Sequence, residues 1–357
     1  MNNLQKLSHH FDQSPWLDNL SRDLIDSGQL HAFVERGVRG VTTNPTILEN
    51  AIAKSETYTE QIKQLAAEGL DAKAIYWRIV EDDVKRATDI LRPVWEASNH
   101  LDGYVSIEVA PDLAEDADAT LAQARHIWSA LNAPNLMIKV PAVDESLPAI
   151  AQLLKEGINV NATLIFSLDH YQKVASAHRA SHDVGNPNTS RSVASFFISR
   201  VDSEVDKRLE AIGTQEALDL RGQAAVAQAH LAYKLFLDVF GDAAVLEGNS
   251  PAVQRLLWAS TSTKNEAYDD LLYVRYLVAP HTVNTLPEDT ISRIIDHLSD
   301  ETRSLNLVDI ENAKNYMKKL AAVGVDINNV SETLESEGVQ KFQASFTSLL
   351  ETIKSRM

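Results

Sequence analysis

The chain alternates short runs of apolar residues with longer stretches in which apolar residues recur every three or four positions. The short runs have the length of β-strands, and the longer stretches have the period of amphipathic helices. A strand–helix alternation of this kind indicates a parallel sheet. The predicted strands cover residues 14–19, 39–45, 103–111, 135–142, 159–167, 193–200, 255–262 and 281–287.

Helical stretches separate these strands. The predicted helices cover residues 20–35, 112–131, 145–156, 168–180 and 221–240. Eight strands within a chain of 357 residues suit a closed barrel ringed by helices. We therefore expect an α/β fold, a (β/α)8 TIM barrel, built as a single domain over residues 1–357.

Two segments hold more sequence than one crossover needs. Residues 47–99 have room for about two extra helices, and residues 289–357 predict a C-terminal helical extension. The final helix carries an amphipathic stripe that must dock on another surface. This stripe consists of Val339, Phe342, Phe346, Leu349 and Ile353. It can cover the barrel mouth, pack on the outer ring or meet a second subunit, and the pattern does not choose among these.

Composition narrows the classes of function. The chain has 50 acidic and 33 basic residues and a formal charge of −17, so its surface repels nucleic acid and anionic membranes. It contains no cysteine, which excludes disulfides, thiolate zinc sites and thiol nucleophiles. Neither an apolar signal-peptide core nor a run long enough to span a bilayer is visible, so we expect a cytoplasmic protein.

One predicted strand carries a lysine at its centre. Lys139 lies in NLMIKVPAVD, flanked by Ile138 and Val140, and a buried ammonium is costly unless it is paired or neutral. The alternative is an edge strand whose lysine reaches water. A neutral lysine amine can attack a ketone and form a Schiff base.

Desolvation would raise the fraction of such an amine that is neutral and therefore reactive. An ordinary lysine has a pKa of about 10.4, so only about one in a thousand is neutral at pH 7. Apolar neighbours favour the neutral form, whereas a nearby carboxylate opposes it. We therefore expect Glu108, on the preceding strand, to act through bound water rather than as a close ion pair.

Other polar residues stand at the carboxyl ends of predicted strands, where barrel enzymes carry out their chemistry. They are Asp18, Asn44, Glu108, Asn161, Thr163, Ser195, Arg200, Ser260, Ser262 and Lys264. Each has a simpler explanation by itself: Asp18 and Asn44 suit helix caps or turns, and Thr163 is an ordinary strand former. Their joint occurrence at one end predicts a lysine nucleophile with acid/base neighbours and a cationic site for an anion.

Six segments, in order, resemble a known family. WLDN, GVTTNPT, VSIEVAP, MIKVPA, INVNATLIFS and SFFISRVD are similar to those of the transaldolases, class I aldolases with a (β/α)8 barrel. The resemblance covers about residues 14–290, and the length resembles the longer bacterial branch, which has additional C-terminal helices.

The resemblance implies roles for the catalytic residues. Lys139 stands at the position of the Schiff-base lysine. Asp18 stands where an acid/base takes the proton of the substrate C4 hydroxyl. Glu108 and Thr163 match the pair that holds a water for proton transfer.

It also implies substrate-binding residues. Asn44 and Asn161 match residues that bond sugar hydroxyls, and Ser195 and Arg200 match the site of the sugar phosphate. Lys264 replaces an arginine on the loop after the seventh strand, which keeps the charge but loses the bidentate fork. Ser260, on the same strand end, is a further candidate for substrate binding. The family's Ser-Pro-Phe is Ser195-Phe196-Phe197 here.

The implied reaction moves a dihydroxyacetone unit from sedoheptulose 7-phosphate to glyceraldehyde 3-phosphate, giving erythrose 4-phosphate and fructose 6-phosphate in the pentose phosphate pathway. One alternative is a lyase similar to fructose-6-phosphate aldolase. The resemblance gives such a lyase a tyrosine near the water of the catalytic lysine, where this chain has Glu108. The other alternative is a catalytically silent barrel that binds sugar phosphates. The expected partners are sugar phosphates only, with a monomer or a homodimer as the assembly.

No metal or other cofactor is expected. His178 and His182 are four residues apart on a predicted helix, which is the spacing of two zinc ligands. No glutamate stands beside the first histidine, and Schiff-base chemistry needs no metal. We therefore interpret this pair as part of a solvated helix face.

Overall fold

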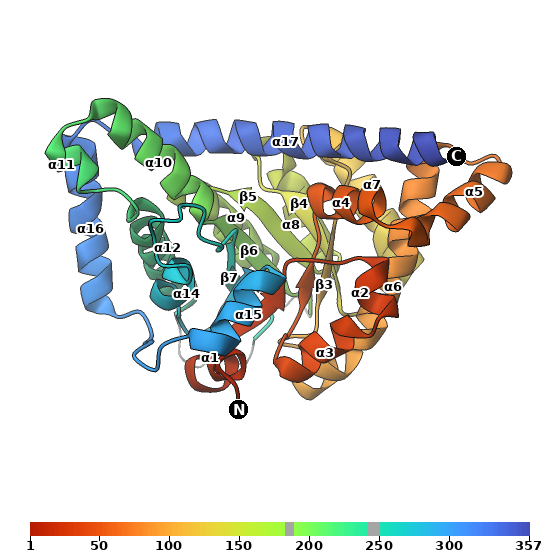
Figure 1. The fold of residues 1–357 in the computed structure, drawn as a ribbon, viewed down its shortest axis with the longest axis horizontal. Helices are drawn as coiled ribbons and strands as arrows, with labels where there is room; N and C mark the ends of the chain where they lie inside the picture. Colours follow the sequence, from red (N-terminus) through yellow and green to blue (C-terminus); the bar gives the residue numbers. More distant parts are fainter. Residues whose placement is uncertain (183–188, 242–249) are drawn as a thin grey trace.

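The structure is a computed structural model that describes residues 1–182, 189–241 and 250–357. Eight parallel strands close into a barrel in chain order, from β1 to β8 and back to β1 (Figure 1). They are β1 (Gln13–Leu17), β2 (Val41–Thr42), β3 (Val105–Glu108), β4 (Leu136–Pro141), β5 (Val160–Ile165), β6 (Ser192–Phe197), β7 (Gln254–Ala259) and β8 (Thr282–Leu286). Each overlaps its predicted strand, so the predicted (β/α)8 barrel is confirmed.

Helices surround the barrel and extend beyond it (Figure 1). They are α1 (Asn3–Phe11), α2 (Arg22–Asp26), α3 (Gln29–Arg36), α4 (Pro45–Lys54), α5 (Thr59–Ala67), α6 (Ala72–Ala97), α7 (Ala117–Leu131), α8 (Leu147–Lys155), α9 (Leu168–Ser181), α10 (Ser199–Ile212), α11 (Gln215–Leu218), α12 (Ala224–Phe240), α14 (Leu272–Tyr276), α15 (Glu288–His297), α16 (Leu307–Ala322) and α17 (Ile327–Arg356). The described residues also form three 3₁₀ turns: η1 (Glu56–Tyr58), η2 (Pro111–Leu113) and η3 (Asp144–Ser146).

Two predicted helical segments differ from the observed ones. The helix expected over residues 20–35 is broken into α2 and α3 because Gly28 has a φ of 75°, in the left-handed region that ends a helix. The region expected to hold about two helices, residues 47–99, forms three: α4, α5 and α6.

All eight predicted strands run past the observed carboxyl ends, and the second and sixth run into the α-helix that follows. The second strand stops at Thr42 because the Asn44 side chain accepts a hydrogen bond from the Ile47 amide (3.0 Å) and caps α4. The sixth strand stops at Phe197, and Arg200 lies in the first turn of α10. In both cases the polar residue that was assigned to a strand end begins the following helix.

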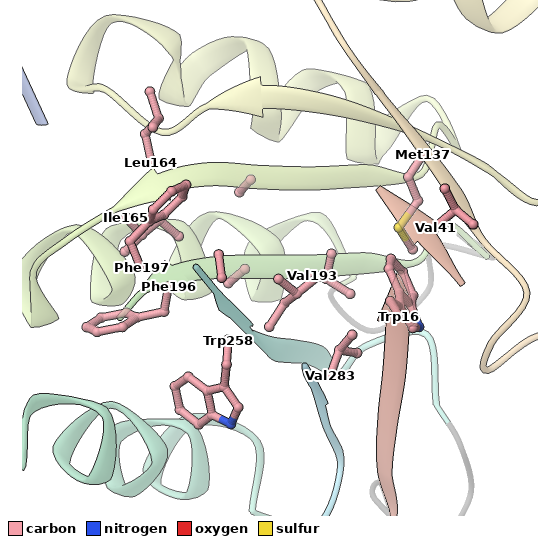
Figure 2. Packing of buried hydrophobic residues seen from close by; sticks show 14 of the residues in the cluster. Trp16, Val41, Met137, Leu164, Ile165, Val193, Phe196, Phe197, Trp258 and Val283 are labelled. Atoms are coloured by element: carbon pink, nitrogen blue, oxygen red, sulfur yellow. The ribbon is translucent and has the colours of Figure 1, made fainter. Parts of the chain in front are cut away.

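The barrel interior is packed with side chains. Figure 2 shows Trp16, Met137, Val193 and Val283, from four different strands, among the buried residues of one cluster. Trp16 is fully buried, and a Cβ on Gly40 would lie 2.5 Å from its ring. Only glycine therefore fits on the chain beside this tryptophan.

A buried polar group ties together the amino ends of the strands. Arg255 of β7 forms an ion pair with Asp102 (3.1 Å) and donates a hydrogen bond to the Ser14 hydroxyl (2.6 Å). All three residues are at most 5% exposed. This end of the barrel is closed by a charge network, which leaves the carboxyl end for a site.

The C-terminal helix α17 crosses the carboxyl end of the barrel. In Figure 1 it runs along the top of the molecule, from α10 on one side to α5 on the other. The Ser331 hydroxyl donates a hydrogen bond to the Phe166 carbonyl (2.8 Å), and the Ser345 hydroxyl lies 2.8 Å from that of Thr46. Arg356 donates hydrogen bonds to backbone carbonyls at the end of α4. Of the three placements left open for the amphipathic stripe, the structure shows the barrel mouth.

The stripe is buried as its pattern requires. Phe342, Phe346, Leu349 and Ile353 are each less than 5% exposed, and Val339 is half-buried. Among the residues that the structure describes, none of the helices combines the length and apolarity needed to cross a membrane.

Candidate active site

A cavity of about 390 Å³ opens at the carboxyl ends of the strands, beneath α17. It is lined by all the predicted site residues except Glu108, Asn161 and Ser262: Asp18, Asn44, Lys139, Thr163, Ser195, Arg200, Ser260 and Lys264. A larger hollow of about 910 Å³ lies beside α9 and α17 and contains none of them. The convergence of reactive groups, rather than size, identifies the smaller cavity as the candidate site.

Lys139 is the central residue of this cavity. It projects from β4, is 5% exposed, and donates a hydrogen bond from Nζ to the Thr43 carbonyl (3.1 Å). Its Nζ lies 3.2 Å from Oε2 of Glu108. The alternative in which this lysine reaches bulk water from an edge strand is therefore excluded.

The close contact between Lys139 and Glu108 corrects one expectation. We expected Glu108 to act through water and not as a close ion pair, but the two residues are register partners on β3 and β4. Neighbouring strands lie about 4.8 Å apart, so two side chains on the same face must meet. Burial raises the pKa of the Glu108 carboxyl, and the positive charge of Lys139 opposes that rise.

Thr163 belongs to the same cavity as the amine. It is fully buried on β5 and lines the cavity, and its hydroxyl has no hydrogen-bond partner among the described residues. The strand is irregular directly after it, because Leu164 has a φ of 61° and the pairing with β6 shifts there. Such bulges turn side chains at functional sites. A buried hydroxyl left unpaired is available to a substrate or a water.

Asp18 faces the same cavity from the end of β1. It follows directly after Leu17 and is half-buried. Burial raises the pKa of its carboxyl, while the positive charges of Lys139 and Lys264 oppose the rise. A carboxyl with a raised pKa can accept and return a proton near neutral pH.

Asn161 lies below the cavity. It is fully buried, and its side chain donates a hydrogen bond to Ser106 (3.1 Å) and accepts one from Ser195 (2.6 Å). Ser195 itself lines the cavity. The structure therefore places Asn161 as the support of Ser195 and does not bring its amide to the cavity wall.

Two of the predicted cations stand at the rim. Arg200 stacks over Phe197, with 5.3 Å from its guanidinium carbon to the ring centroid. Burial lowers the pKa of Arg200, although an arginine stays charged at neutral pH. Lys264 donates a hydrogen bond to Ser262 (2.6 Å).

Ser260 links the strand end to the helix that carries Arg200. Its hydroxyl lies 2.9 Å from that of Ser199, the first residue of α10. Its φ of 59° is uncommon for a residue with a side chain. The constraint fixes the end of β7 against the start of α10.

Among the cavity residues that the sequence prediction missed, two come from α17. Phe342 was assigned only to the docking stripe, yet its ring centroid lies 5.8 Å from Nζ of Lys139. Lys341 also lines the cavity. A single lysine on the polar side of an amphipathic helix gives no signal, because its role depends on where the helix docks.

The histidine pair on α9 is not a solvated face. His178 is fully buried and burial lowers its pKa to about 3, so that expectation was wrong. Its ring packs against that of His182 at a tilt of 35°, with 4.3 Å between centroids. His178 lies on the same side of α9 as Tyr171 and Val174, which face the core. Throughout the described part of the chain, we find no cluster of three side chains able to hold a metal ion.

The arrangement suits carbonyl chemistry by an amine. A buried lysine lies against a carboxyl, a second carboxyl and a free hydroxyl share its cavity, and cations stand at the rim. Nucleophilic lysines act through such neighbours, because proton transfers accompany both formation and loss of the C=N bond.

Known proteins match this chain over nearly its full length. The family described as Transaldolase/Fructose-6-phosphate aldolase matches residues 15–353. A transaldolase of Mycobacterium tuberculosis is 46% identical over 358 residues, covering 96% of this chain and 94% of its own, and one of Mycobacterium ulcerans is 47% identical over 356 residues with the same coverage. A Coccidioides immitis structure described as a "putative fructose-1,6-biphosphate aldolase" shows 11% identity and a TM-score of 0.30 over 90% of both chains, and no argument is built on it. The chain belongs to the transaldolase/fructose-6-phosphate aldolase family.

Proposed function

We propose that this protein is a transaldolase that transfers a dihydroxyacetone unit from sedoheptulose 7-phosphate to glyceraldehyde 3-phosphate. The products are erythrose 4-phosphate and fructose 6-phosphate. The observation that carries the proposal is the position of Lys139, which is 5% exposed inside the barrel mouth and lies 3.2 Å from Glu108. Membership of the family supports the same activity.

The first half of the reaction forms the Schiff base. A proton passes from the Lys139 ammonium to Glu108, leaving two neutral groups, which a buried site favours over two charges. The neutral amine attacks the ketone carbon, and the carbinolamine then loses its hydroxyl as water to give the iminium. Glu108 supplies the proton that this water needs, with Thr163 orienting the exchange.

The second half breaks and remakes a carbon–carbon bond. Asp18 takes the proton of the C4 hydroxyl, the C3–C4 bond breaks, and its electron pair moves into the iminium to give an enamine. The aldose product leaves, the acceptor aldehyde enters, and the steps run in reverse. The enamine must survive this exchange, so a cover that limits water is part of the chemistry. The helix α17 lies in the right place to provide that cover.

The remaining residues hold the sugar. Arg200 and Lys264 suit the terminal phosphate, because both are cations that line the cavity. Asn44, Ser195 and Ser260 line the wall between these points and can bond the hydroxyls of an extended sugar chain. Asn161 contributes by orienting Ser195.

Trapping with borohydride tests the nucleophile. Reduction in the presence of fructose 6-phosphate should add mass only to the peptide that contains Lys139, and Lys139→Met should give no adduct. An adduct on Lys264, or no adduct on the wild-type protein, contradicts the mechanism.

Product analysis tests the transfer. With fructose 6-phosphate and erythrose 4-phosphate, a transaldolase forms sedoheptulose 7-phosphate and releases little dihydroxyacetone. Free dihydroxyacetone as the main product would instead identify an aldolase-type lyase. Binding of the sugar phosphate with neither product would identify a silent barrel.

The proposal extends to the setting of the enzyme. The reaction belongs to the non-oxidative pentose phosphate pathway, and we place it in the cytoplasm with a monomer or a homodimer as the assembly. Analytical ultracentrifugation distinguishes these two states.

A further inference from the structure

Besides Lys139, three cations from three different elements line the same cavity. Arg200 comes from α10, Lys264 from the loop after β7, and Lys341 from α17. We call these residues the cation rim. The chain as a whole carries a charge of −17, so three positive groups around one cavity oppose the general charge of its surface.

The members of the rim have no close counter-ion, although the charge of Glu337 acts on Arg200 and that of Asp18 on Lys264 from farther away. Among residues 1–182, 189–241 and 250–357, none of the three forms an ion pair within 4.0 Å. Partial burial lowers the pKa of Lys264, Asp18 opposes this, and the positive charges of Lys341 and Arg200 lower it further. A bound anion would lower the repulsion between these like charges.

The position of Lys341 follows from the docking of one turn of α17. A Cβ on Gly338 would lie 3.6 Å from Nη1 of Arg200, so this end of the turn touches the rim. At the other end, Phe342 lies over the amine of Lys139. Lys341 stands on the same turn and reaches the cavity between the phosphate end and the reacting end.

We propose that Lys341 is a third cation for the substrate phosphate, and that the C-terminal helix thereby helps the enzyme select phosphorylated sugars. The inference rests on the proposed function for the identity of the anion. A flexible ammonium on a separate helix adds charge to the site without the fixed fork of an arginine.

Kinetics with matched lysine variants test this role. Lys341→Ala and Lys341→Arg are compared with Lys354→Ala, which removes the same charge from an exposed position of the same helix outside the cavity. The donors are fructose 6-phosphate and unphosphorylated fructose, and inorganic phosphate serves as a competitive inhibitor.

For Lys341→Ala we expect KM for fructose 6-phosphate and Ki for inorganic phosphate to rise by about tenfold, with kcat nearly unchanged, as for one lost charge-assisted contact. The value of kcat/KM for fructose should stay within about twofold of wild type, and Lys341→Arg should restore most of the phosphate affinity. The difference in phosphate affinity between wild type and Lys341→Ala should shrink as salt is raised, because the contact of Lys341 with the phosphate is partly exposed.

Two outcomes would overturn the inference: Lys341→Ala behaving like Lys354→Ala, or equal losses for fructose and fructose 6-phosphate. The proposed function is judged separately, by borohydride trapping on Lys139. Calorimetric binding of inorganic phosphate to wild type and Lys341→Ala reports on the cation rim whether or not trapping succeeds.

Discussion

The ring of Phe342 lies over the amine of Lys139, with 5.8 Å between Nζ and the ring centroid. The two residues come from the C-terminal helix and from the centre of the barrel, 203 positions apart in the chain. The helix α17 therefore forms part of the active-site wall and closes the space in which an enamine would wait for its acceptor.

Shortening this ring should admit water to the enamine. We expect Phe342→Leu to raise the fraction of turnovers that end in free dihydroxyacetone by about tenfold, because protonation by water then competes with the acceptor. The control is Phe346→Leu, which changes a ring that packs on Tyr76 of α6 and does not line the cavity. Product partitioning is the measurement, and equal partitioning in both variants would show that Phe342 only packs.

Glu108 should control formation of the Schiff base. Burial raises its pKa above the ordinary 4.5. As pH falls, Glu108 therefore becomes protonated at a higher pH than an exposed glutamate, and it can then no longer accept the lysine proton. The rate of Schiff-base formation, followed by rapid borohydride quenching, should fall on the acid side with a midpoint above 4.5. In Glu108→Gln the acid-side fall in the pH profile should vanish, and the rate of Schiff-base formation on the plateau should drop by about 10²–10³-fold. A Glu108→Gln profile with an unchanged acid limb would assign the titration to another group.

Replacing Asp18 should impair carbon–carbon bond cleavage without impairing formation of the Schiff base. We expect Asp18→Asn to form the trapped adduct with fructose 6-phosphate at nearly the wild-type level, while kcat for transfer falls by about 10²–10⁴-fold because the C4 hydroxyl keeps its proton. Mass spectrometry of the adduct and a transfer assay give the two readings. Loss of both together would place Asp18 in Schiff-base formation instead.

The fold and most of the site were predictable because the local sequence alone shows approximately where each strand ends. Each strand is a short apolar run, and in a closed barrel every carboxyl end meets at one face. Lys139, Asp18 and Thr163 could thus be placed in one cavity without knowledge of the packing. Strand ends were the weakest point, since Asn44 and Arg200 belong to the helices that follow.

Other features depend on contacts that no local pattern contains. Glu108 and Lys139 meet because of the register between β3 and β4, which the sequence alone did not specify. The burial of His178 and the reach of Lys341 into the cavity depend on where two helices dock. An amphipathic stripe shows that α17 must dock, but the opposing surface decides what it covers.

A histidine contact joins α17 to α9 and should make stability depend on pH. Nδ1 of His170 lies 2.5 Å from Oε2 of Glu335, and this contact raises the His170 pKa above 6.5, with partial burial opposing and Asp144 adding to the rise. The native state then holds the proton more tightly than the unfolded state. This stability is present in full below pH 6.5 and is lost as pH rises through the native pKa. The urea midpoint of wild type should exceed that of His170→Gln most at pH 6, with the difference shrinking towards pH 9; a constant difference would indicate packing alone.

Gly338 should set how closely α17 lies on the barrel. A Cβ there would meet Leu164 at 3.2 Å, Phe166 at 3.5 Å and Arg200 at 3.6 Å. A single methyl is tolerable if the end of the Leu164 side chain shifts, whereas valine adds two further methyl groups next to a contact that is already tight. We therefore expect Gly338→Val to lift this turn of the helix and to destabilise the protein by about 1–3 kcal/mol, as overpacking does.

Gly338→Val should also alter substrate binding and product release, because it displaces two residues near Gly338. Displacing Arg200 weakens the grip on phosphate, and lifting Phe342 uncovers the amine, so both KM for fructose 6-phosphate and release of free dihydroxyacetone should rise. The matched control is Ala344→Val, which places the same side chain on an exposed position of α17. If Gly338→Val lowered the thermal midpoint but left both kinetic values equal to those of Ala344→Val, α17 would stabilise the barrel without shaping its active site.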